Sequence, residues 1–413
     1  MNDELSIEYK IPKIDESELS EQEQKAKKSY KKLLESNLDM TGWIDYPNDI
    51  SEEFISQILK IADEIKNKYT ALVIVGIGGS YLGAQAAFDY IKRDYEGPKI
   101  FFAGINLSTE YHNNILNQLK NESPALLIIS KSGGTTETLV AGNIFMEYLE
   151  NRFGEKEKDK RIYIITDPKK GRLRNMVNEK KYPSLPIPGN IGGRYSVLTA
   201  VGLLPMAVSG INIKEIIEGA KSARRECIIN KAVKLASVRN LIEQREYFIE
   251  LFASFDPYME KFINWIKQLY GESEGKNNKG IFPVYVDYTK DLHSLGQFIQ
   301  EGRPMFSETF ISVKENDEKN IPIHKSWGIS DDDLTMTQLN SITREGVISA
   351  HCSADVPITM IELQSRTEHT FGQAVYFFQI SCAIRGLMMD IDPFNQPGVE
   401  KYKEETRKKL KNQ

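Results

Sequence analysis

The sequence has little cysteine, no excess of basic charge and no long apolar run, and each shortage excludes a class of protein. Its three cysteines, Cys227, Cys352 and Cys382, are far apart, so neither a disulfide framework nor a cysteine zinc site is expected. The net charge of −5 argues against a nucleic-acid binder. No apolar stretch approaches the length of a membrane span, and the acidic, polar N-terminus is not a secretory signal. A reducing cytoplasm is the expected compartment.

Nucleotide and metal motifs are missing as well. The glycine-rich stretch 76–83 has Tyr81 where the dinucleotide fingerprint G-x-G-x-x-G needs its last glycine, and no acidic residue ends the following strand. No G-K-[ST] of a P-loop, no HxxH or HExxH and no aspartate-rich ligand set is present. A dinucleotide-dependent oxidoreductase is therefore disfavoured, and neither a cofactor nor a metal is expected.

Short apolar runs alternate with helical segments along most of the chain. The runs predict strands over 71–75, 99–104, 125–130, 161–166, 280–288, 309–314 and 356–363. Helical patterns cover 17–36, 81–92, 136–150, 196–208, 213 to about 270, 292–300, 333–351, 370–389 and a last stretch from about 398. Such alternation implies right-handed crossovers and parallel sheets covered on both faces. The predicted fold is α/β, with two tandem doubly wound parallel sheets and helical extensions at both ends.

This order of elements also suggests domain ranges. Residues 1–45 are expected to form an N-terminal helical extension, 46–212 a first α/β domain and 213–390 a second one. Residues 391–413 would form a C-terminal segment. Residues 314–333 are polar and predict a surface excursion.

Two loops at predicted strand ends suggest an anion site. GIGGSYLG (76–83) follows a strand and opens a helix, where free backbone N–H groups favour an anion and glycine allows close approach. SKSGGTTET (130–138) also links a strand to a helix and is rich in hydroxyl groups. Either loop alone is also consistent with an ordinary tight turn or helix cap. Together, at the carboxyl ends of two strands of one sheet, they predict a ligand crevice at a switch in strand order.

At this point the motifs support a resemblance to a known family. GIGGSYLG, SKSGGTTET, GGRYSVLTAVGLLP, GESEGK, DLHSLGQFIQEG and NQPGVEKYK, in this order, resemble phosphoglucose isomerase from about residue 42 to 403. Length and motif spacing are similar to the short bacterial form. The resemblance implies sugar-isomerase domains and reversible isomerisation of glucose 6-phosphate and fructose 6-phosphate, in glycolysis and gluconeogenesis. The reaction would proceed by ring opening and an enediolate, without a cofactor.

The resemblance also implies roles for individual residues. It implies that the phosphate is held by the two loops, through Gly79, Ser80, Ser130, Lys131, Ser132 and Thr135. Glu272 would be the catalytic base and Arg194 would stabilise the intermediate. His293, with Lys403, would assist ring opening, and Gln268 and Gln396 would line the sugar. In the family the histidine comes from the partner subunit of a homodimer. Gly134 is a departure, because related sequences often have threonine there.

The chemistry of these residue types agrees with the roles. A carboxylate can move a proton between neighbouring carbons, and a permanently charged arginine can stabilise an anionic intermediate. Ring opening needs a group that titrates near neutrality, and His293 follows a predicted strand. Spacing alone does not separate Glu272 from Glu274, which is two residues further on. Without the family match, ordinary structural roles would be expected: Arg194 as a surface arginine, His293 as a structural histidine and Lys403 as a solvated lysine.

Two other functions remain open from the sequence. A related isomerase that also accepts mannose 6-phosphate would have the same motifs. A non-catalytic sugar-phosphate-binding regulator on the same fold would bind without turnover, usually with an attached DNA-binding module, and no such module or basic patch is visible. The expected partners are a small sugar phosphate and a second copy of the chain, with no nucleic acid and no membrane.

Overall fold

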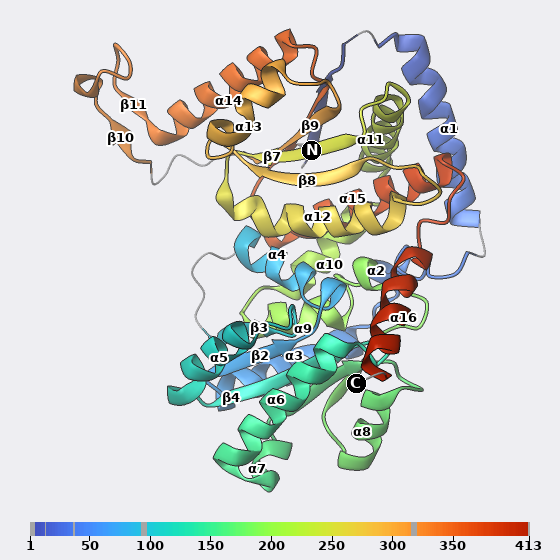
Figure 1. Cartoon of the computed structure of the whole chain (residues 1–413), viewed down its shortest axis with the longest axis vertical. Coiled ribbons are helices and arrows are strands. Elements are labelled where there is room, and N and C mark those ends of the chain that lie inside the picture. The colour runs from blue at the N-terminus through green and yellow to red at the C-terminus, as the bar shows by residue number, and fades with distance from the viewer. Residues whose placement is uncertain (1–4, 13, 36–37, 92–96, 315–319, 412–413) are drawn as a thin grey trace. The chain divides into compact units, whose positions relative to one another are not determined.

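The seven predicted strands are distributed over two separate five-stranded sheets, one in each of two units of the computed structural model (Figure 1). The structure describes residues 5–12, 14–35, 38–91, 97–314 and 320–411. The first unit comprises Asn37–Ala223 and Phe371–Tyr376, and the second comprises Met1–Ser36, Arg224–Thr370 and Phe377–Gln413.

The sheet of the first unit is entirely parallel, with the strand order β3-β2-β4-β5-β6. Its strands are β2 (Ala71–Val75), β3 (Lys99–Ala103), β4 (Pro124–Ser130), β5 (Ile162–Thr166) and β6 (Ser184–Pro186). All residues of β2, β4 and β5 are buried, as expected for strands covered on both faces. The chain steps outward from β2 to β3 and then returns past β2 to β4. Strand order therefore reverses between β2 and β4, the strands that precede the two predicted anion loops.

Helices enclose this sheet. They are α2 (Tyr46–Asp49), α3 (Glu52–Lys68), α4 (Leu82–Ile91), α5 (Thr109–Gln118), α6 (Thr136–Phe153), α7 (Glu155–Asp159), α8 (Arg172–Lys180), α9 (Ala200–Val208) and α10 (Ile213–Ser222), with 3₁₀ turns η1 (Gly78–Ser80), η2 (Leu119–Asn121) and η3 (Gly193–Tyr195). One core joins the strands to apolar residues of α5, α6 and α8. Helix α9 is buried along its whole length and packs against α3 and α4.

The sheet of the second unit has the order β1-β12-β9-β7-β8, in which β1 is antiparallel and the other strands are parallel. The strands are β1 (Leu5–Lys10), β7 (Ile249–Ser254), β8 (Phe282–Asp287), β9 (Phe306–Val313) and β12 (Ile358–Leu363). The remaining elements are α1 (Glu16–Glu35), α11 (Glu226–Gln244), η4 (Pro257–Met259), α12 (Glu260–Glu274), α13 (Leu292–Glu301), β10 (Pro322–Ile323), η6 (Lys325–Trp327), β11 (Leu334–Thr335), α14 (Met336–Ser353), α15 (Glu368–Met388) and α16 (Pro397–Lys411).

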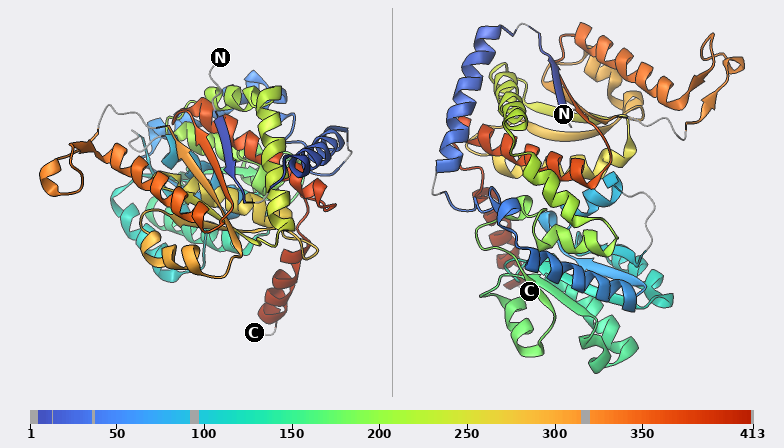
Figure 2. Two further views of the ribbon diagram at one scale, coloured as in Figure 1. Left: turned by 90° about the horizontal axis from the view of Figure 1, so that it is seen from above. Right: turned by 180° about the vertical axis from the view of Figure 1, so that it is seen from behind.

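Two different sets of helices cover the faces of this second sheet (Figures 1 and 2). On one face, Ile299 of α13 and Ile348 of α14 join the core around Phe310. On the other face lie α11, α12 and α15: the ring of Phe252 is 5.7 Å from that of Tyr270 on α12. Alternation along each strand places successive side chains on opposite faces, so residues of α12 and α14 are separated by the sheet.

The structure contains elements of the first unit that the sequence prediction lacks, among them α3, α5, α8 and β6, and it also corrects the prediction in the second unit. The sequence predicts helix from 213 to about 270, but β7 interrupts this stretch and is a central strand of the second sheet. The N-terminal segment contains not only the expected helix but also β1, which pairs with β12 from Leu5↔Leu363 to Lys10↔Ile358. Helix α1 packs on α11, so residues 1–36 belong to the second unit.

The division of α15 between the units also differs from the predicted domain ranges. Residues 371–376 are grouped with the first unit, because Tyr376 donates a hydrogen bond to the carbonyl of Ile44 and Gly372 lies against the backbone of Ile216. Of the predicted surface excursion 314–333, residues 315–319 lie outside the described part of the chain. Beyond them, β10 and β11 pair as a hairpin that leads into α14. No described helix has both the length and the apolar character needed to span a membrane.

Candidate active site

The first anion loop leaves β2 through Gly76 and turns into α4 by way of η1. Gly78 has a φ of 58°, a conformation that glycine adopts at little cost. Gly79 is needed for a different reason: a Cβ there would lie 2.0 Å from the carbonyl oxygen of Gly193. The loop therefore packs backbone to backbone against η3, the turn that contains Arg194. Ser80, the last residue of η1, is partly exposed.

The second anion loop follows β4 and opens the long helix α6. The buried hydroxyl of Ser130 accepts a hydrogen bond from the N–H of Gly133 at 3.1 Å and so shapes the loop itself. Ser132 is exposed and accepts from the N–H of Gly134 at 3.2 Å. Thr135 is the N-cap residue of α6, yet its side chain makes no capping hydrogen bond. The first N–H groups of an 18-residue helix thus point to a site beside two hydroxyl groups, which suits an anion.

Lys131 links this loop to the segment that leads into the GGRYSVLTAVGLLP motif. Its Nζ donates to the carbonyl oxygens of Gly189 at 2.7 Å and Ile191 at 3.0 Å. Burial of the ammonium group lowers the pKa of Lys131 from its usual value. The same segment is also held by Gly42, whose N–H donates to the carbonyl of Asn190 at 3.0 Å.

Arg194 is almost completely buried, with 1% of its surface exposed. It lies in η3, and its guanidinium carbon is 5.5 Å from the centre of the Tyr195 ring. Tyr195 in turn stacks on Trp43 at 4.7 Å. The reading of Arg194 as a solvated surface arginine is therefore wrong.

In the second unit, Glu272 lies in the last turn of α12, with a partly buried side chain. Its two carboxylate oxygens have different amide donors. Gln268, one turn earlier on α12, donates to Oε1 at 3.1 Å, and Gln396, just before α16, donates to Oε2 at 2.7 Å. The structure thus brings together three predicted site residues that are up to 128 positions apart in sequence.

The rival carboxylate, Glu274, has a different environment. It is fully buried and receives hydrogen bonds from Arg239 at 2.5 and 3.1 Å and from the guanidinium of Arg385. Two residues along a helix correspond to a rotation of about 200°, so Glu274 faces the core while Glu272 faces away from it. The two carboxylates therefore have different environments, a difference that their spacing in the sequence does not show.

His293 and Lys403 do not contact Glu272 in any interaction among the described residues. His293 is exposed in the first turn of α13, beyond the carboxyl end of β8. Lys403 lies in the second turn of α16, and its Nζ is 2.8 Å from Glu400. The C-terminal segment before α16 is fixed at its other end: Lys276 and Lys279 donate to the carbonyl oxygens of Asp392 and Met389 at 2.5 and 2.7 Å.

The position of His293 follows from the topology of the second unit. Strands β7 and β8 are parallel, so α12 must return from the carboxyl edge of the sheet to its amino edge. Glu272, near the end of α12, therefore lies toward the amino edge, whereas His293 lies beyond the carboxyl end of β8. Six residues of β8 separate the two edges, about 20 Å of strand.

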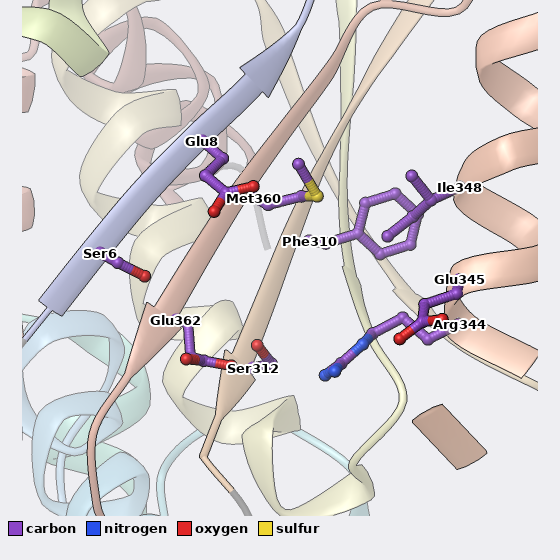
Figure 3. A pocket seen from close by; sticks show the side chains of 9 residues that line it. All are labelled: Ser6, Glu8, Phe310, Ser312, Arg344, Glu345, Ile348, Met360 and Glu362. Atoms are coloured by element: carbon purple, nitrogen blue, oxygen red, sulfur yellow. The ribbon is translucent and has the colours of Figure 1, made fainter. Parts of the chain in front are cut away.

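A pocket on the second sheet has none of these residues in its lining. It is lined by β1, β9, β12 and α14, through Ser6, Glu8, Phe310, Ser312, Arg344, Glu345, Ile348, Met360 and Glu362 (Figure 3). These side chains lie on the α14 face of the sheet, opposite to the face that α12 covers. Within the described residues, no group of three or more His, Cys, Asp or Glu side chains is arranged to hold a metal ion.

Sequence reasoning missed several residues that shape these sites. The arginines that hold Glu274 lie 35 residues before it and 111 residues after it, and no local motif marks them. Thr138, in the first turn of α6, has a buried hydroxyl with no hydrogen-bond partner among the described residues. Its place in the SKSGGTTET motif is the only signal that the sequence offers for it.

Solved structures define the class of protein to which this fold belongs. The chain superposes on a hypothetical protein from Thermus thermophilus with a TM-score of 0.87 and 24% identity, over 98% of this chain and all of that one. It superposes on a glucose-6-phosphate isomerase from Chlamydia trachomatis with a TM-score of 0.80 and 17% identity, over 98% and 88% of the two chains. The chain thus belongs to the class of α/β proteins that share this two-sheet fold.

Sequence comparison narrows this class to one family. The model of the phosphoglucose isomerase family matches residues 48–413. A glucose-6-phosphate isomerase of Staphylococcus aureus (strain NCTC 8325 / PS 47) is 40% identical over 94% of this chain and 91% of its own length. One from Fusobacterium nucleatum is 42% identical over 88% and 84% of the two chains. The chain belongs to the phosphoglucose isomerase family.

Proposed function

We propose that this chain is an enzyme that interconverts glucose 6-phosphate and fructose 6-phosphate. The observation that carries the proposal is the oriented carboxylate of Glu272, held by Gln268 and Gln396, in a chain that matches the family over residues 48–413. Aldose–ketose isomerisation needs one base that removes a proton from a carbon and returns it to the next carbon. A carboxylate with a fixed orientation can do both without changing its partners.

The phosphate is assigned to the two loops at the switch point of the first unit. Gly79 and Ser80 lie in the turn before α4, and Ser132 and Thr135 lie just before the first N–H groups of α6. Ser130 acts mainly on the loop, since its hydroxyl accepts from Gly133. Lys131 provides a nearby positive charge, although its Nζ donates to backbone carbonyls. Helix N-termini and hydroxyl groups bind a phosphate monoester without a metal bridge.

Proton transfer is assigned to Glu272 and Arg194. Glu272 takes the proton from C2 of the open-chain aldose and delivers it to C1, through an enediolate. Arg194 stabilises the negative charge of that intermediate, because a guanidinium donates hydrogen bonds in a fixed plane and cannot take up the moving proton. Gln268 can also bind the sugar: its Nε2 donates to Glu272, while its buried Oε1 has no partner among the described residues and can accept from a hydroxyl group.

The active enzyme in this proposal is a homodimer in which His293 serves the site of the partner. Within one chain, Glu272 and His293 lie toward opposite edges of one sheet, so a neighbouring copy is the natural source of the histidine. Exposed apolar side chains accompany His293 on its own helix, on α14 and on the β10–β11 arm: Leu295, Phe298, Trp327, Ile329, Met336 and Ile342. Such a surface fits a subunit interface. His293, with Lys403, would open the sugar ring there.

Mixed dimers test this arrangement. Glu272→Gln and His293→Ala subunits, inactive alone, should regain activity when they are co-expressed, because half of the dimers are mixed and each mixed dimer has one intact site. The expected recovery is about a quarter of wild-type activity. Mixed dimers, isolated with two affinity tags, that remain inactive would show that His293 acts within its own chain.

The reaction itself is tested by substrate profiling. Purified enzyme should convert fructose 6-phosphate to glucose 6-phosphate, which a coupled dehydrogenase detects. Turnover of mannose 6-phosphate as well would identify the broader isomerase. Binding of fructose 6-phosphate without turnover would favour a regulatory binding protein. Cytoplasmic location and a role in glycolysis and gluconeogenesis follow from the proposed reaction and belong to the same proposal.

A further inference from the structure

A buried network of five charged side chains surrounds the end of α12. Arg239 of α11 contacts Glu250 of β7 at 2.7 Å and Glu274 of α12 at 2.5 Å. Arg385 of α15 binds the other oxygen of Glu274 and also Glu243 of α11. Thr309 of β9 completes the set by donating to Glu250 at 2.7 Å. Three helices and two strands of the second unit therefore meet through Glu274.

The network is unusually well enclosed for so much charge. Arg239, Arg385 and Glu274 are each 0% exposed, and Glu250 is 1% exposed. The ring of Tyr270, one turn before Glu274, lies 4.0 Å from the guanidinium carbon of Arg239. Forked arginine–carboxylate contacts fix both the distance and the direction between the side chains that they join. Apolar residues of similar volume would fill the same space and give a protein that is no less stable. The distinctive property of this network is its geometry.

The local sequence alone predicts a weakly stable last turn of α12. Glu272 lies between Gly271 and Gly275, and glycine is a poor helix former. The turn that follows contains Asn277 and Asn278 with φ values of 54° and 58° and returns to the sheet only at β8. A helix end of this composition normally frays. The contacts of Glu274 with two arginines hold the last turn against fraying.

We propose that Glu274 is a positioning residue, which fixes the last turn of α12 through Arg239 and Arg385 and thereby holds the carboxylate of Glu272 in register for proton transfer. This inference rests on the proposed function of Glu272 as the base. Glu274 points into the core and touches neither Gln268 nor Gln396 in any described interaction. It acts on the backbone of Glu272, while the two amides act on its carboxylate.

Steady-state kinetics of two network variants test the proposal. Glu274→Gln removes the charge but keeps the shape, and Arg385→Lys keeps a charge but loses the fork. In both, kcat for fructose 6-phosphate should fall by about ten- to a hundredfold, since small misplacement of a catalytic group has effects of this size. KM should stay within about twofold, because the phosphate loops belong to the first unit and are unchanged.

A control separates positioning from a general loss of stability. Leu149→Ala removes a buried side chain near the end of α6, thirteen residues or about 20 Å of helix after Thr136, the first residue of that helix. It should lower the urea midpoint comparably while leaving kcat unchanged. If Glu274→Gln does not fold, Arg385→Lys provides the same comparison. A wild-type kcat in a folded network variant would overturn the proposal, as would an equal loss in Leu149→Ala.

A double-mutant cycle identifies Glu272 as the residue through which Glu274 acts. Glu272→Asp already shortens and misplaces the base. Adding Glu274→Gln to this variant should therefore lower kcat by a clearly smaller factor than the same change does in the wild-type enzyme. Fully multiplicative effects would show that Glu274 acts elsewhere and would overturn the inference. Failure of the proposed function itself is recognised separately, because wild-type enzyme would then show no isomerisation.

Discussion

Replacement of Gln396 by leucine is the sharpest test of how the base is oriented. Leucine keeps much of the side-chain volume but removes the amide that donates to Oε2 of Glu272 at 2.7 Å. A hydrogen bond to a charged group contributes about 1.5–3 kcal/mol. If this bond holds the carboxylate for proton transfer, its loss lowers kcat by about tenfold to a hundredfold, at about 1.36 kcal/mol for each factor of ten.

The distribution of this effect between kcat and KM distinguishes two roles of Gln396. An amide that orients the base affects mainly kcat, whereas an amide that only lines the sugar affects mainly KM. The assay is steady-state conversion of fructose 6-phosphate, with Gln57→Leu as control, because Gln57 is exposed on α3 of the first unit. A higher KM with unchanged kcat would refute the reasoning from the hydrogen bond, and so would wild-type kinetics.

Other predictions concern binding and stability. Lys131→Met removes the hydrogen bonds between the second anion loop and the carbonyls of Gly189 and Ile191. It should lower the urea midpoint by the equivalent of about 1–2 kcal/mol and raise KM for fructose 6-phosphate. An unchanged midpoint would show that these hydrogen bonds do not stabilise the loop. Thr335→Ala removes the capping box of α14 and should cost about 1 kcal/mol, measured by urea unfolding, whereas an unchanged midpoint would show that the cap contributes nothing. Burial and the hydrogen bond to Glu308 raise the pKa of Tyr288. Because the pKa of Tyr288 is higher in the folded state, its contribution to stability is complete below about pH 10 and is lost as the pH rises through the folded-state pKa. Part of the tyrosinate absorbance should therefore appear only when the protein unfolds in alkali and loses its ellipticity. Titration of all 19 tyrosines in one step near pH 10, with the fold intact, would contradict this.

The first unit could be predicted from its sequence as far as strands β2, β3, β4 and β5, but β6 and helices α3, α5 and α8 were not predicted. Its strands are continuous apolar runs because both faces are buried, and the loops after β2 and β4 carry glycine and hydroxyl signals at the point where strand order reverses. The sequence does not indicate that Gly79 is needed to approach Gly193 or that Lys131 bonds to backbone carbonyls. Both depend on contacts between segments more than 50 residues apart.

The second unit shows where local patterns are insufficient. Strand β7, with the sequence IELFAS, contains Glu250 and follows a charged helical region, so local patterns did not mark it as a strand. The charge of Glu250 is neutralised by Arg239, a contact that the sequence does not show. Strand β1 is an edge strand with alternating polar residues and is defined only by its pairing with β12. The choice between Glu272 and Glu274 likewise depends on tertiary contacts, because only the partners of each carboxylate show which one is fixed in the core.

The most direct test of the account is the rate of Glu272→Gln beside wild type, with fructose 6-phosphate binding measured separately by calorimetry. The amide keeps the size of the side chain and can still contact Gln268 and Gln396, but it cannot accept the proton. A general base contributes about 10²- to 10⁴-fold, so kcat should fall by at least about a hundredfold while the substrate still binds. A folded variant that retains wild-type kcat would contradict the assignment of Glu272 as the base.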